Sequence, residues 1–403
     1  MEKHRVVITG LGAVSAFGLT KNIFWSEISK GKSAVKPLIF GDELKMKLGY
    51  TLENFSPEDY FESKELSLLD RFSQLAIIAA KEAIADSVMQ AKPLNNIAVV
   101  MGSGSGGKHT DEEGYYKLYK QGNSHVHPFM IPKGMHSAVA SNVSKYLNLN
   151  GPTFSVSSAC ASGSHAIIQG ALMVQAGVVE QAIVGASDAP FAFGILKAWD
   201  ALRVVSNDQC RPFSKDRNGM ILGEGAGVLA IETLDSALAR GANIYAEIAG
   251  YGMASDAAHI THPDVNGIKI AITRALNSAN MMPMEVNYIN AHGTGTVVND
   301  RTESQAINSI FGEKFDQPLT SSTKAMHGHA LGASSALEAI ATILAMKHNL
   351  VPPTINYNEH DDNCDLNIVI GKGQVQTIEK AMSNSFAFGG LNSSIVFKLL
   401  IEH

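Results

Sequence analysis

The chain has 403 residues, of which 45% are hydrophobic and 17% are charged, which is enough apolar material for two or three domains or one large α/β unit. A net charge of -6 argues against a nucleic-acid-binding protein, because phosphate binding needs a basic face. Three widely separated cysteines indicate a reducing compartment, and no apolar run approaches the roughly 18 residues of a membrane span, so we expect a soluble cytoplasmic protein.

Short apolar, β-branched segments alternate along the chain with longer segments of helical periodicity. The predicted strands are residues 5–9, 96–101, 181–184, 228–232, 246–249, 288–291 and 394–399. The predicted helices are residues 67–86, 164–176, 268–279 and 333–347. This alternation predicts an α/β protein with a mostly parallel sheet that is covered on both faces. Segment 164–176 is apolar nearly all round, so we expect it to be a buried central helix.

A short internal repeat divides the chain into two parts. Residues 8–15, I-T-G-L-G-A-V-S, resemble residues 248–255, I-A-G-Y-G-M-A-S, and four of the eight positions are identical. Each copy follows an apolar strand, which predicts two halves of related architecture, at residues 1–245 and 246–403. We interpret the paired glycines as a tight strand-to-helix turn.

Gly102 to Gly107 spells the dinucleotide-binding fingerprint, and Gly10 to Ser15 nearly does. That fingerprint also needs an acidic residue about 20 positions further on, at the end of the next strand. Neither copy has one at that place, so we do not expect nucleotide binding.

Metal binding is the next possibility, because three histidine pairs are closely spaced. No cysteine or carboxylate joins these pairs at the spacing of a zinc site, so we expect no catalytic metal and leave open a structural cation near Glu338. The pairs are His125 with His127, His259 with His262, and His327 with His329.

Cys160 lies among small residues, S-V-S-S-A-C-A-S-G-S (155–164), where we predict that a strand gives way to the central helix. A buried cysteine is usually a small hydrophobe without chemistry. A helix start, however, stabilises a thiolate through its dipole, and its free N–H groups can stabilise an oxyanion on an attacked carbonyl. Two histidines in the second half, His292 and His329, are flanked by glycine at a strand end and a helix start. One cysteine with two such histidines favours an acyl-transfer site.

The chain resembles the β-ketoacyl-[acyl-carrier-protein] synthases of the elongating, synthase I/II type, over nearly its full length. The matching motifs are V-V-I-T-G-L-G-A-V-S (6–15), G-P-T-F-S-V-S-S-A-C-A-S-G (151–163), R-P-F-S-K-D-R-N-G-M-I-L-G-E-G-A-G (211–227), N-A-H-G-T-G-T (290–296), S-S-T-K-A-M-H-G-H-A-L-G-A (321–333) and N-S-F-A-F-G-G-L-N (384–392). The resemblance implies the thiolase fold, with two related βαβαβαββ halves in a layered α-β-α-β-α architecture.

The resemblance also implies roles for individual residues. Cys160 would be the acylated nucleophile, and His292 and His329 would bind the malonyl thioester and promote its decarboxylation. The remaining implied residues are Lys324 and its partner Glu338, the supporting Asp300, Phe386 and Phe388 in the oxyanion and gating region, Thr294 and Thr296 on the phosphopantetheine arm, and Ser105 and Phe193 in the acyl pocket. The resemblance implies no bound cofactor and no metal, because the substrates travel on the phosphopantetheine of an acyl-carrier protein.

Several positions depart from the family pattern. Ala387 and Leu391 stand where glycine and threonine are usual, and we expect a gating loop with fewer accessible states, because alanine does not reach positive φ cheaply. His327 is either a third imidazole near the site or a packed neighbour, and we favour the neighbour. Ser105, in place of a bulkier apolar residue, suggests a differently shaped acyl pocket. These departures leave open specialised polyketide or polyene assembly and fatty-acid elongation.

The reaction expected from the resemblance is a decarboxylative Claisen condensation of an acyl chain on Cys160 with malonyl-acyl-carrier protein. The alternatives are a non-catalytic chain-length partner, a thiolase or initiating synthase, and a purely structural protein. The retained Cys160, His292 and His329 disfavour the first and last, and the lack of a C-terminal cysteine motif disfavours a thiolase. We expect a homodimer, or a heterodimer with a related subunit. Candidate cations for docking an acidic carrier protein are Lys133, Arg211, Lys215 and Arg217.

Overall fold

The computed structural model describes residues 3–400 except 41–42, 54 and 90–95, and a ten-stranded mixed sheet runs through them in the order β10-β9-β13-β14-β8-β1-β7-β6-β4-β5. The strands of the first half are β1 (Val6–Val14), β4 (Ala98–Gly102), β5 (Thr153–Val156), β6 (Gln181–Asp188) and β7 (Gly225–Thr233). Those of the second half are β8 (Ala246–Ser255), β9 (Tyr288–Asn290), β10 (Leu319–Ser321), β13 (Lys380–Ala387) and β14 (Leu391–Lys398). Short pairing between β1 and β8 joins the two halves of the sheet.

The two halves of the sheet have the same topology. In each half the third strand pairs in parallel with the second, and the second with the fourth, whereas the fifth is antiparallel to both the fourth and the first. The predicted mostly parallel sheet is therefore wrong, because the last two pairings of each half, and the β1–β8 junction, are antiparallel. The predicted repeat of βαβαβαββ halves is confirmed. The chain boundary at residue 245 stays a prediction.

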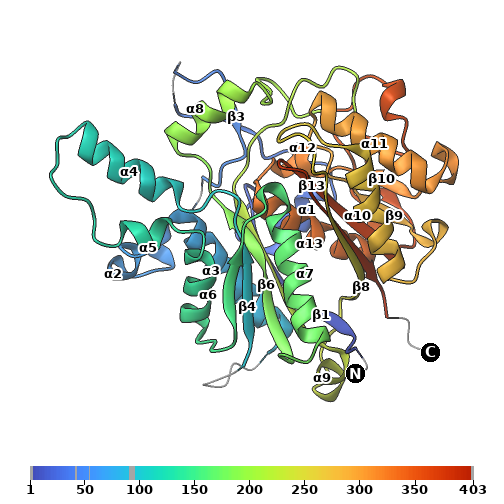
Figure 1. Cartoon of the computed structure of the whole chain (residues 1–403), viewed down its shortest axis with the longest axis horizontal. Coiled ribbons are helices and arrows are strands. Elements are labelled where there is room, and N and C mark those ends of the chain that lie inside the picture. The colour runs from blue at the N-terminus through green and yellow to red at the C-terminus, as the bar shows by residue number, and fades with distance from the viewer. Residues whose placement is uncertain (1–2, 41–42, 54, 90–95, 401–403) are drawn as a thin grey trace.

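Five layers stack across the molecule (Figure 1). Helix α7 (Ser162–Gln175) and helix α13 (Gly332–His348) form the central layer between the two half-sheets. Helix α3 (Arg71–Ser87) covers the outer face of the first half-sheet, and helix α10 (Val265–Ser278) covers the second. Buried apolar side chains fill the spaces on both faces of each half-sheet. The four predicted helices, two central and two outer, are thus all present, and their ends differ from the predicted ends by a few residues.

The remaining elements connect or flank these layers. The other α-helices are α1 (Lys21–Ile28), α2 (Ser63–Leu66), α4 (Lys108–Tyr119), α5 (Met130–Gly134), α6 (Ala138–Leu147), α8 (Phe193–Leu202), α9 (Leu234–Ala239), α11 (Val297–Phe311) and α12 (Lys324–His327). The 3₁₀ turns are η2 (Pro57–Asp59), η3 (Ala159–Ala161), η4 (Pro283–Glu285), η5 (Lys314–Asp316) and η6 (Asp362–Cys364). Two small sheets pair β2 (Lys36–Pro37) with β3 (Leu48–Gly49) and β11 (Leu350–Val351) with β12 (Gln374–Val375).

The repeated glycines lie inside strands, so the predicted strand-to-helix turn at these positions is wrong. Gly12 lies in β1 under α3, where an added Cβ would stand 1.9 Å from the Ala79 carbonyl oxygen. Gly252 lies in β8 under α10, where a Cβ would stand 2.0 Å from the Ala271 carbonyl oxygen. Each strand also carries a register shift at the same place of the repeat, near Ile8 and near Ile248. The glycines therefore serve close contact between strand and helix in both halves.

Within the part of the chain that the structure describes, no helix is both long enough and apolar enough to cross a membrane.

Candidate active site

Cys160 lies in the 3₁₀ turn η3, immediately before the central helix α7. The turn is tight: Ala159 adopts a left-handed φ of 49°, and the Ser162 hydroxyl donates to the Ala159 carbonyl oxygen at 2.7 Å while accepting the Ser158 N–H at 2.9 Å. Gly163 lies so close to α13 that a Cβ there would stand 2.7 Å from the Ser335 hydroxyl. The small residues around Cys160 therefore allow both the sharp turn and the contact between the two central helices.

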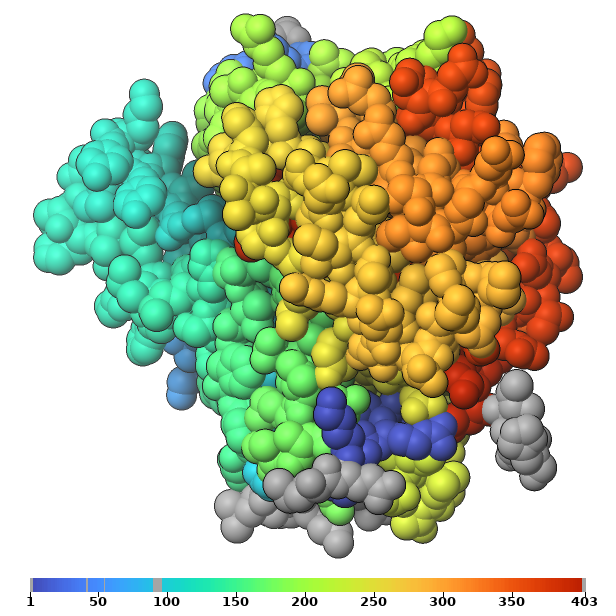
Figure 2. Space-filling view, turned by 45° about the vertical axis from the view of Figure 1, so that its right-hand side comes forward, coloured from blue at the N-terminus to red at the C-terminus, as the bar shows by residue number. Residues whose placement is uncertain are grey.

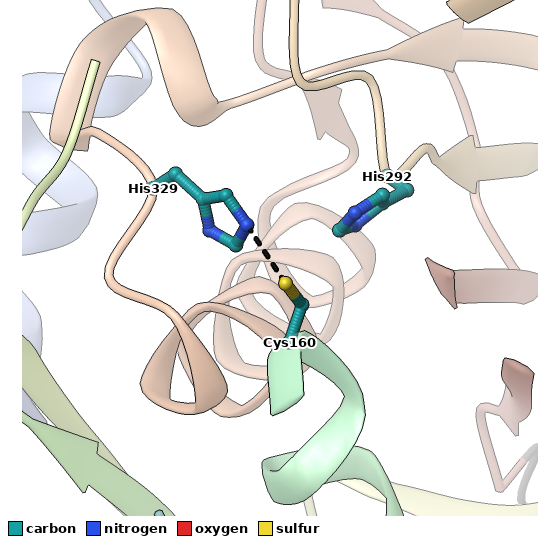
Figure 3. A group of neighbouring side chains, drawn as sticks. All are labelled: Cys160, His292 and His329. Carbon is teal, nitrogen blue, oxygen red and sulfur yellow. Dashed lines mark hydrogen bonds between the residues drawn. The ribbon is translucent and has the colours of Figure 1, made fainter. Parts of the chain in front are cut away.

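His329 comes from the second half of the chain and contacts the cysteine directly (Figure 3). Its Nε2 lies 3.1 Å from Cys160 Sγ, and its Nδ1 lies 3.0 Å from the Ser334 hydroxyl. The backbone of His329 is held on both sides, because its N–H donates to the Ile221 carbonyl and its own carbonyl accepts the Gly223 N–H. In the tautomer whose Nδ1–H donates to Ser334, Nε2 presents its lone pair to the thiol.

His292 stands across the same space, at the end of β9. Its ring centroid is 5.6 Å from that of His329, with the two rings nearly perpendicular at 86°. Glu303 on α11 fixes its backbone, because the two carboxylate oxygens accept the N–H groups of His292 and Gly293, each at 2.8 Å. Gly293 is needed here, since it has a positive φ of 37° and a Cβ would stand 2.6 Å from Ser322.

Lys324 and Glu338 form a fully buried ion pair behind the histidines. The Lys324 ammonium also donates to the His292 carbonyl oxygen at 2.5 Å and lies 3.3 Å from His292 Nδ1. An ammonium is only a donor, so Nδ1 accepts and the ring proton resides on Nε2. Lys324 therefore sets the tautomer in which His292 can donate a hydrogen bond through Nε2.

Burial dominates the protonation of the three central side chains. It raises the pKa of the Cys160 thiol to about 11, against opposing contributions from the Lys324 charge and from the backbone N–H groups of Phe388 and Cys160. The expected stabilisation of a thiolate by the helix start is therefore outweighed. Burial also lowers the pKa of His292 and of His329 well below the usual value, and the Lys324 charge lowers both further. The resting site is a neutral thiol facing neutral imidazoles.

These three side chains open onto a cavity of about 340 Å³. Thr294 and Thr296 line it, with their hydroxyls 2.9 Å apart, as do Phe386 and Phe388. The Phe388 ring stacks on Trp199 at a centroid distance of 6.1 Å. The predicted cysteine, histidines, threonines and phenylalanines are therefore brought together around one space.

Other predicted residues support or lie apart from this cavity. Asp300 is buried beneath it and accepts the N–H groups of Gly295 and Phe213, so it shapes the loop that carries the threonines. Ser105 does not line the cavity; its hydroxyl donates to Asp188 at 2.6 Å. Phe193 lines a separate groove between α4 and α8. The structure thus gives no support to Ser105 and Phe193 as walls of the cavity at Cys160.

The predicted docking cations are mostly neutralised. Arg211 pairs with Asp208 and Asp216, and Lys215 pairs with Glu359. Arg217 is buried against Asp361, so the prediction that it is a surface cation is wrong. Of the four, only Lys133 forms no ion pair among the described residues.

Two histidines near the site do not face the cavity. His165, inside α7, bonds the Ser158 hydroxyl at 2.6 Å. His327 bonds the Thr323 hydroxyl and packs on Phe24, which supports the interpretation of His327 as a packed neighbour.

Cys160, His292 and His329 also form the single three-ligand group among the described residues with a spacing suited to a metal ion, because their donor atoms lie within 4.8 Å of one another. The donor set fits a metal poorly, since the Lys324 ammonium lies against His292 and would repel a cation.

The residues that sequence reasoning missed are Glu303, Ser334 and Asp188. Asp188 is buried and accepts five hydrogen bonds, from Ser103, Gly104, Ser105 and Gly332, and so ties the loop after β4 to the start of α13. The sequence around Asp188 gives no sign of these hydrogen bonds, because the residues that donate them are distant along the chain.

Comparison with known proteins extends over almost the whole chain. Residues 3–237 match the family model of the beta-ketoacyl synthase N-terminal domain, and residues 245–358 match that of the C-terminal domain. Nodulation protein E of Rhizobium leguminosarum bv. trifolii is 43% identical over 399 residues, covering 98% of this chain and 99% of the relative. The 3-oxoacyl-[acyl-carrier-protein] synthase 2 of Staphylococcus aureus (strain COL) is 41% identical over 408 residues, with the same coverage.

Solved structures of ketosynthases also superpose on almost the whole chain. The ishigamide ketosynthase/chain length factor superposes with a TM-score of 0.95 at 33% identity, covering 99% of this chain and 100% of the other. AntDE:AntF, a type II polyketide ketosynthase with its acyl-carrier protein, superposes with a TM-score of 0.89 at 32% identity and the same coverage.

Proposed function

Because the chain belongs to the beta-ketoacyl synthase family, we propose that it is the catalytically competent condensing subunit, with Cys160 as acyl carrier and His292 and His329 as the decarboxylation pair. The observation that carries this proposal is the contact of 3.1 Å between His329 Nε2 and Cys160 Sγ, with His292 facing them across a cavity that opens to solvent. A neutral thiol beside a neutral imidazole is the arrangement in which the imidazole accepts the thiol proton as sulfur attacks.

The first half-reaction loads the acyl chain. Cys160 Sγ attacks the thioester carbonyl of an acyl-acyl-carrier protein, and the thiol proton moves to His329 Nε2. The backbone N–H groups of Cys160 and Phe388, which both reach toward Sγ, support the oxyanion. When the tetrahedral intermediate collapses, the carrier thiolate leaves and takes the proton, so the products are acyl-Cys160 and free carrier thiol.

The second half-reaction joins the chains. His292 Nε2–H donates to the carbonyl oxygen of malonyl-acyl-carrier protein. His329 does the same in its other tautomer, with the Ser334 hydroxyl donating to Nδ1. Loss of CO₂ leaves the electron pair of the broken C–C bond in an enolate, which the two N–H groups stabilise. The enolate carbon attacks the acyl-Cys160 carbonyl, and the C–S bond breaks with its electron pair on Cys160 Sγ. The thiolate takes up one proton from solvent, and the β-ketoacyl-acyl-carrier protein leaves.

A panel of acyl-carrier-protein thioesters, read by intact-mass spectrometry, tests the proposal and identifies the preferred chain. We expect one acyl group per chain, mapped to Cys160, and condensation after malonyl-acyl-carrier protein is added. The matched control is Cys160→Ala, which should neither acylate nor condense. Labelling at another residue, or condensation by Cys160→Ala, would overturn Cys160 as the acyl carrier, and absence of both acylation and condensation in the wild type would favour the chain-length-partner role. A preference for long saturated chains would favour fatty-acid elongation over polyketide or polyene assembly.

We further propose that the working form is a dimer, either of two identical chains or with a related subunit, and that it uses an acyl-carrier protein as its partner. The segment α4–α5 projects from the body (Figure 2) and exposes large apolar side chains, among them Tyr119 at 81% and Ile131 at 71%. The free edge of β5 adjoins solvent as the last strand of the sheet, with Phe154 at 39% exposed. Light scattering on the purified chain distinguishes a homodimer from a monomer that awaits a second subunit.

A further inference from the structure

A buried carboxylate, Asp188, lies where three backbone segments meet, and two of these segments donate hydrogen bonds to it. Asp188 ends β6 and is 0% exposed. From the loop after β4, Oδ1 accepts the Ser105 N–H at 2.8 Å and the hydroxyls of Ser103 and Ser105. Oδ2 accepts the N–H groups of Gly104 and of Gly332 at the start of α13, both at 2.8 Å. Asp188 forms no ion pair with any described residue, so neutral donors alone offset the cost of its burial.

The third segment is the turn η3, which carries Cys160. Gly104 lies against this turn, because an added Cβ there would stand 3.2 Å from the Ala159 carbonyl oxygen. Gly332 lies against the start of α7, because an added Cβ there would stand 2.8 Å from the Cβ of Ser162. The two glycines whose N–H groups share Oδ2 of the carboxylate therefore pack on both sides of Cys160, at residues 159 and 162.

The same carboxylate fixes the approach from His329 to α13. Leu331 lies on this approach, and its φ of 49° and ψ of -125° form a conformation that residues with a side chain rarely adopt. Such strain persists only where surrounding contacts hold it. The Gly332 N–H follows directly after Leu331 and has no acceptor within the helix, because it is the first N–H of α13. Its hydrogen bond to Asp188 supplies a contact that holds the strained residue.

We propose that Asp188 is a positioning residue for the proposed condensation, and that it sets the separation of Cys160 Sγ and His329 Nε2 by holding the backbone that carries each. The inference rests on the proposed function, in which His329 accepts the thiol proton. Asp188 does not line the Cys160 cavity, so it acts without touching the substrate. Burial raises the pKa of the Cys160 thiol, and the Asp188 charge adds to the rise. Electrostatics alone would therefore make this carboxylate a hindrance to acylation, and its benefit lies in geometry.

The test is a double-mutant cycle on the acylation of Cys160 by a short acyl thioester, followed by intact-mass spectrometry at one mildly alkaline pH. Asp188→Asn keeps the shape of the side chain but turns an NH₂ group toward N–H donors. It is made in the wild type and in His329→Ala, in which the separation from His329 no longer matters. Arg301→Gln is the control, since it removes an exposed charge from α11 outside the cavity lining. Urea unfolding checks that each variant is folded.

We expect Asp188→Asn to lower the acylation rate of the wild type by roughly 10- to 100-fold, with KM for the thioester unchanged. In His329→Ala the same substitution should lower the rate by less than about twofold, or raise it, because only the removal of the opposing charge remains. An equal loss in both backgrounds would show a general structural role and overturn the proposal. An unchanged rate in the wild-type background would overturn it as well.

Ser105→Ala is the second variant, and it decides the matter if Asp188→Asn does not fold. It removes one hydroxyl donor to Oδ1 and leaves the carboxylate and the backbone donors in place. We expect a loss of about three- to tenfold in the wild-type background and none in His329→Ala. Equal losses in both backgrounds, or no loss in either, would contradict the positioning role. A wild-type chain whose Cys160 accepts no acyl group at all would instead overturn the proposed function.

Discussion

Replacing Glu303 by glutamine should separate the two half-reactions. The two oxygens of Glu303 accept the N–H groups of His292 and Gly293, whereas a glutamine has one carbonyl oxygen and must turn its NH₂ toward the other N–H. Above pH 8, where Glu303 is ionised, loss of one hydrogen bond to this charged acceptor costs about 1.5–3 kcal/mol, which corresponds to a rate loss of roughly 10- to 150-fold if the transition state carries all of it. Because Cys160 and His329 lie on other elements, their geometry should not change.

The assay measures CO₂ release from malonyl-acyl-carrier protein and, separately, acylation of Cys160 by a short thioester without the pantetheine arm. In Glu303→Gln we expect decarboxylation to fall within that range and acylation to change by less than about threefold. Burial raises the pKa of Glu303 to about 8, and ionisation makes both oxygens acceptors, so the wild-type decarboxylation rate should rise with pH up to that value. The glutamine variant should lack this rise. Equal losses in both half-reactions, with Arg301→Gln as the folded control, would refute the reasoning.

Three further predictions follow from the site. With the pKa of Cys160 raised to about 11, its alkylation by iodoacetamide should accelerate about tenfold per pH unit from pH 7 to 9, and a plateau below pH 8 would contradict the burial argument. Lys324→Met leaves Glu338 buried without its partner and should lower the free energy of unfolding in urea by about 3–5 kcal/mol. The double variant Lys324→Met/Glu338→Leu should restore most of that stability. A Lys324→Met variant as stable as the wild type would contradict this prediction. A positive φ at residue 387 costs alanine about 1–2 kcal/mol, and residue 387 lies in the turn beside Phe388 and Cys160. If this turn must pass through positive φ during acylation, Ala387→Gly should accelerate acylation of Cys160 by roughly 5- to 30-fold. An unchanged rate would show that the turn does not pass through positive φ at residue 387.

The sequence was most informative where a residue type is tied to one chemistry. Cys160, His292 and His329 could be selected from a few cysteines and glycine-flanked histidines, and the structure brings these three together. Lys324 and Glu338 followed from motif position, and they form the buried pair that the resemblance implies. The catalytic roles of these residues stay proposals.

The rest depended on tertiary contacts that have no local pattern. Gly12 suits a turn and a close strand-to-helix contact equally well, and only the packing of α3 decides between them. Glu303 lies in a polar stretch of α11 that is typical of a solvated helix face, yet it is buried by the loop whose N–H groups it accepts. The resemblance implies a place for Ser105 in the acyl pocket, whereas its hydroxyl donates to Asp188 on the neighbouring strand β6.

The reacting atoms come from different halves of the chain: Cys160 from the start of α7, and His329 from the approach to α13. Their separation therefore depends on how the two halves are seated against each other, at a contact where Gly163 leaves no room for even one more carbon. A shift of about 1 Å is enough to cost a reaction roughly a hundredfold in rate. At low denaturant concentrations, turnover should consequently cease while the circular-dichroism spectrum still shows the helices and strands of each half. Catalytic activity is therefore the most sensitive measure of the contact between the two halves.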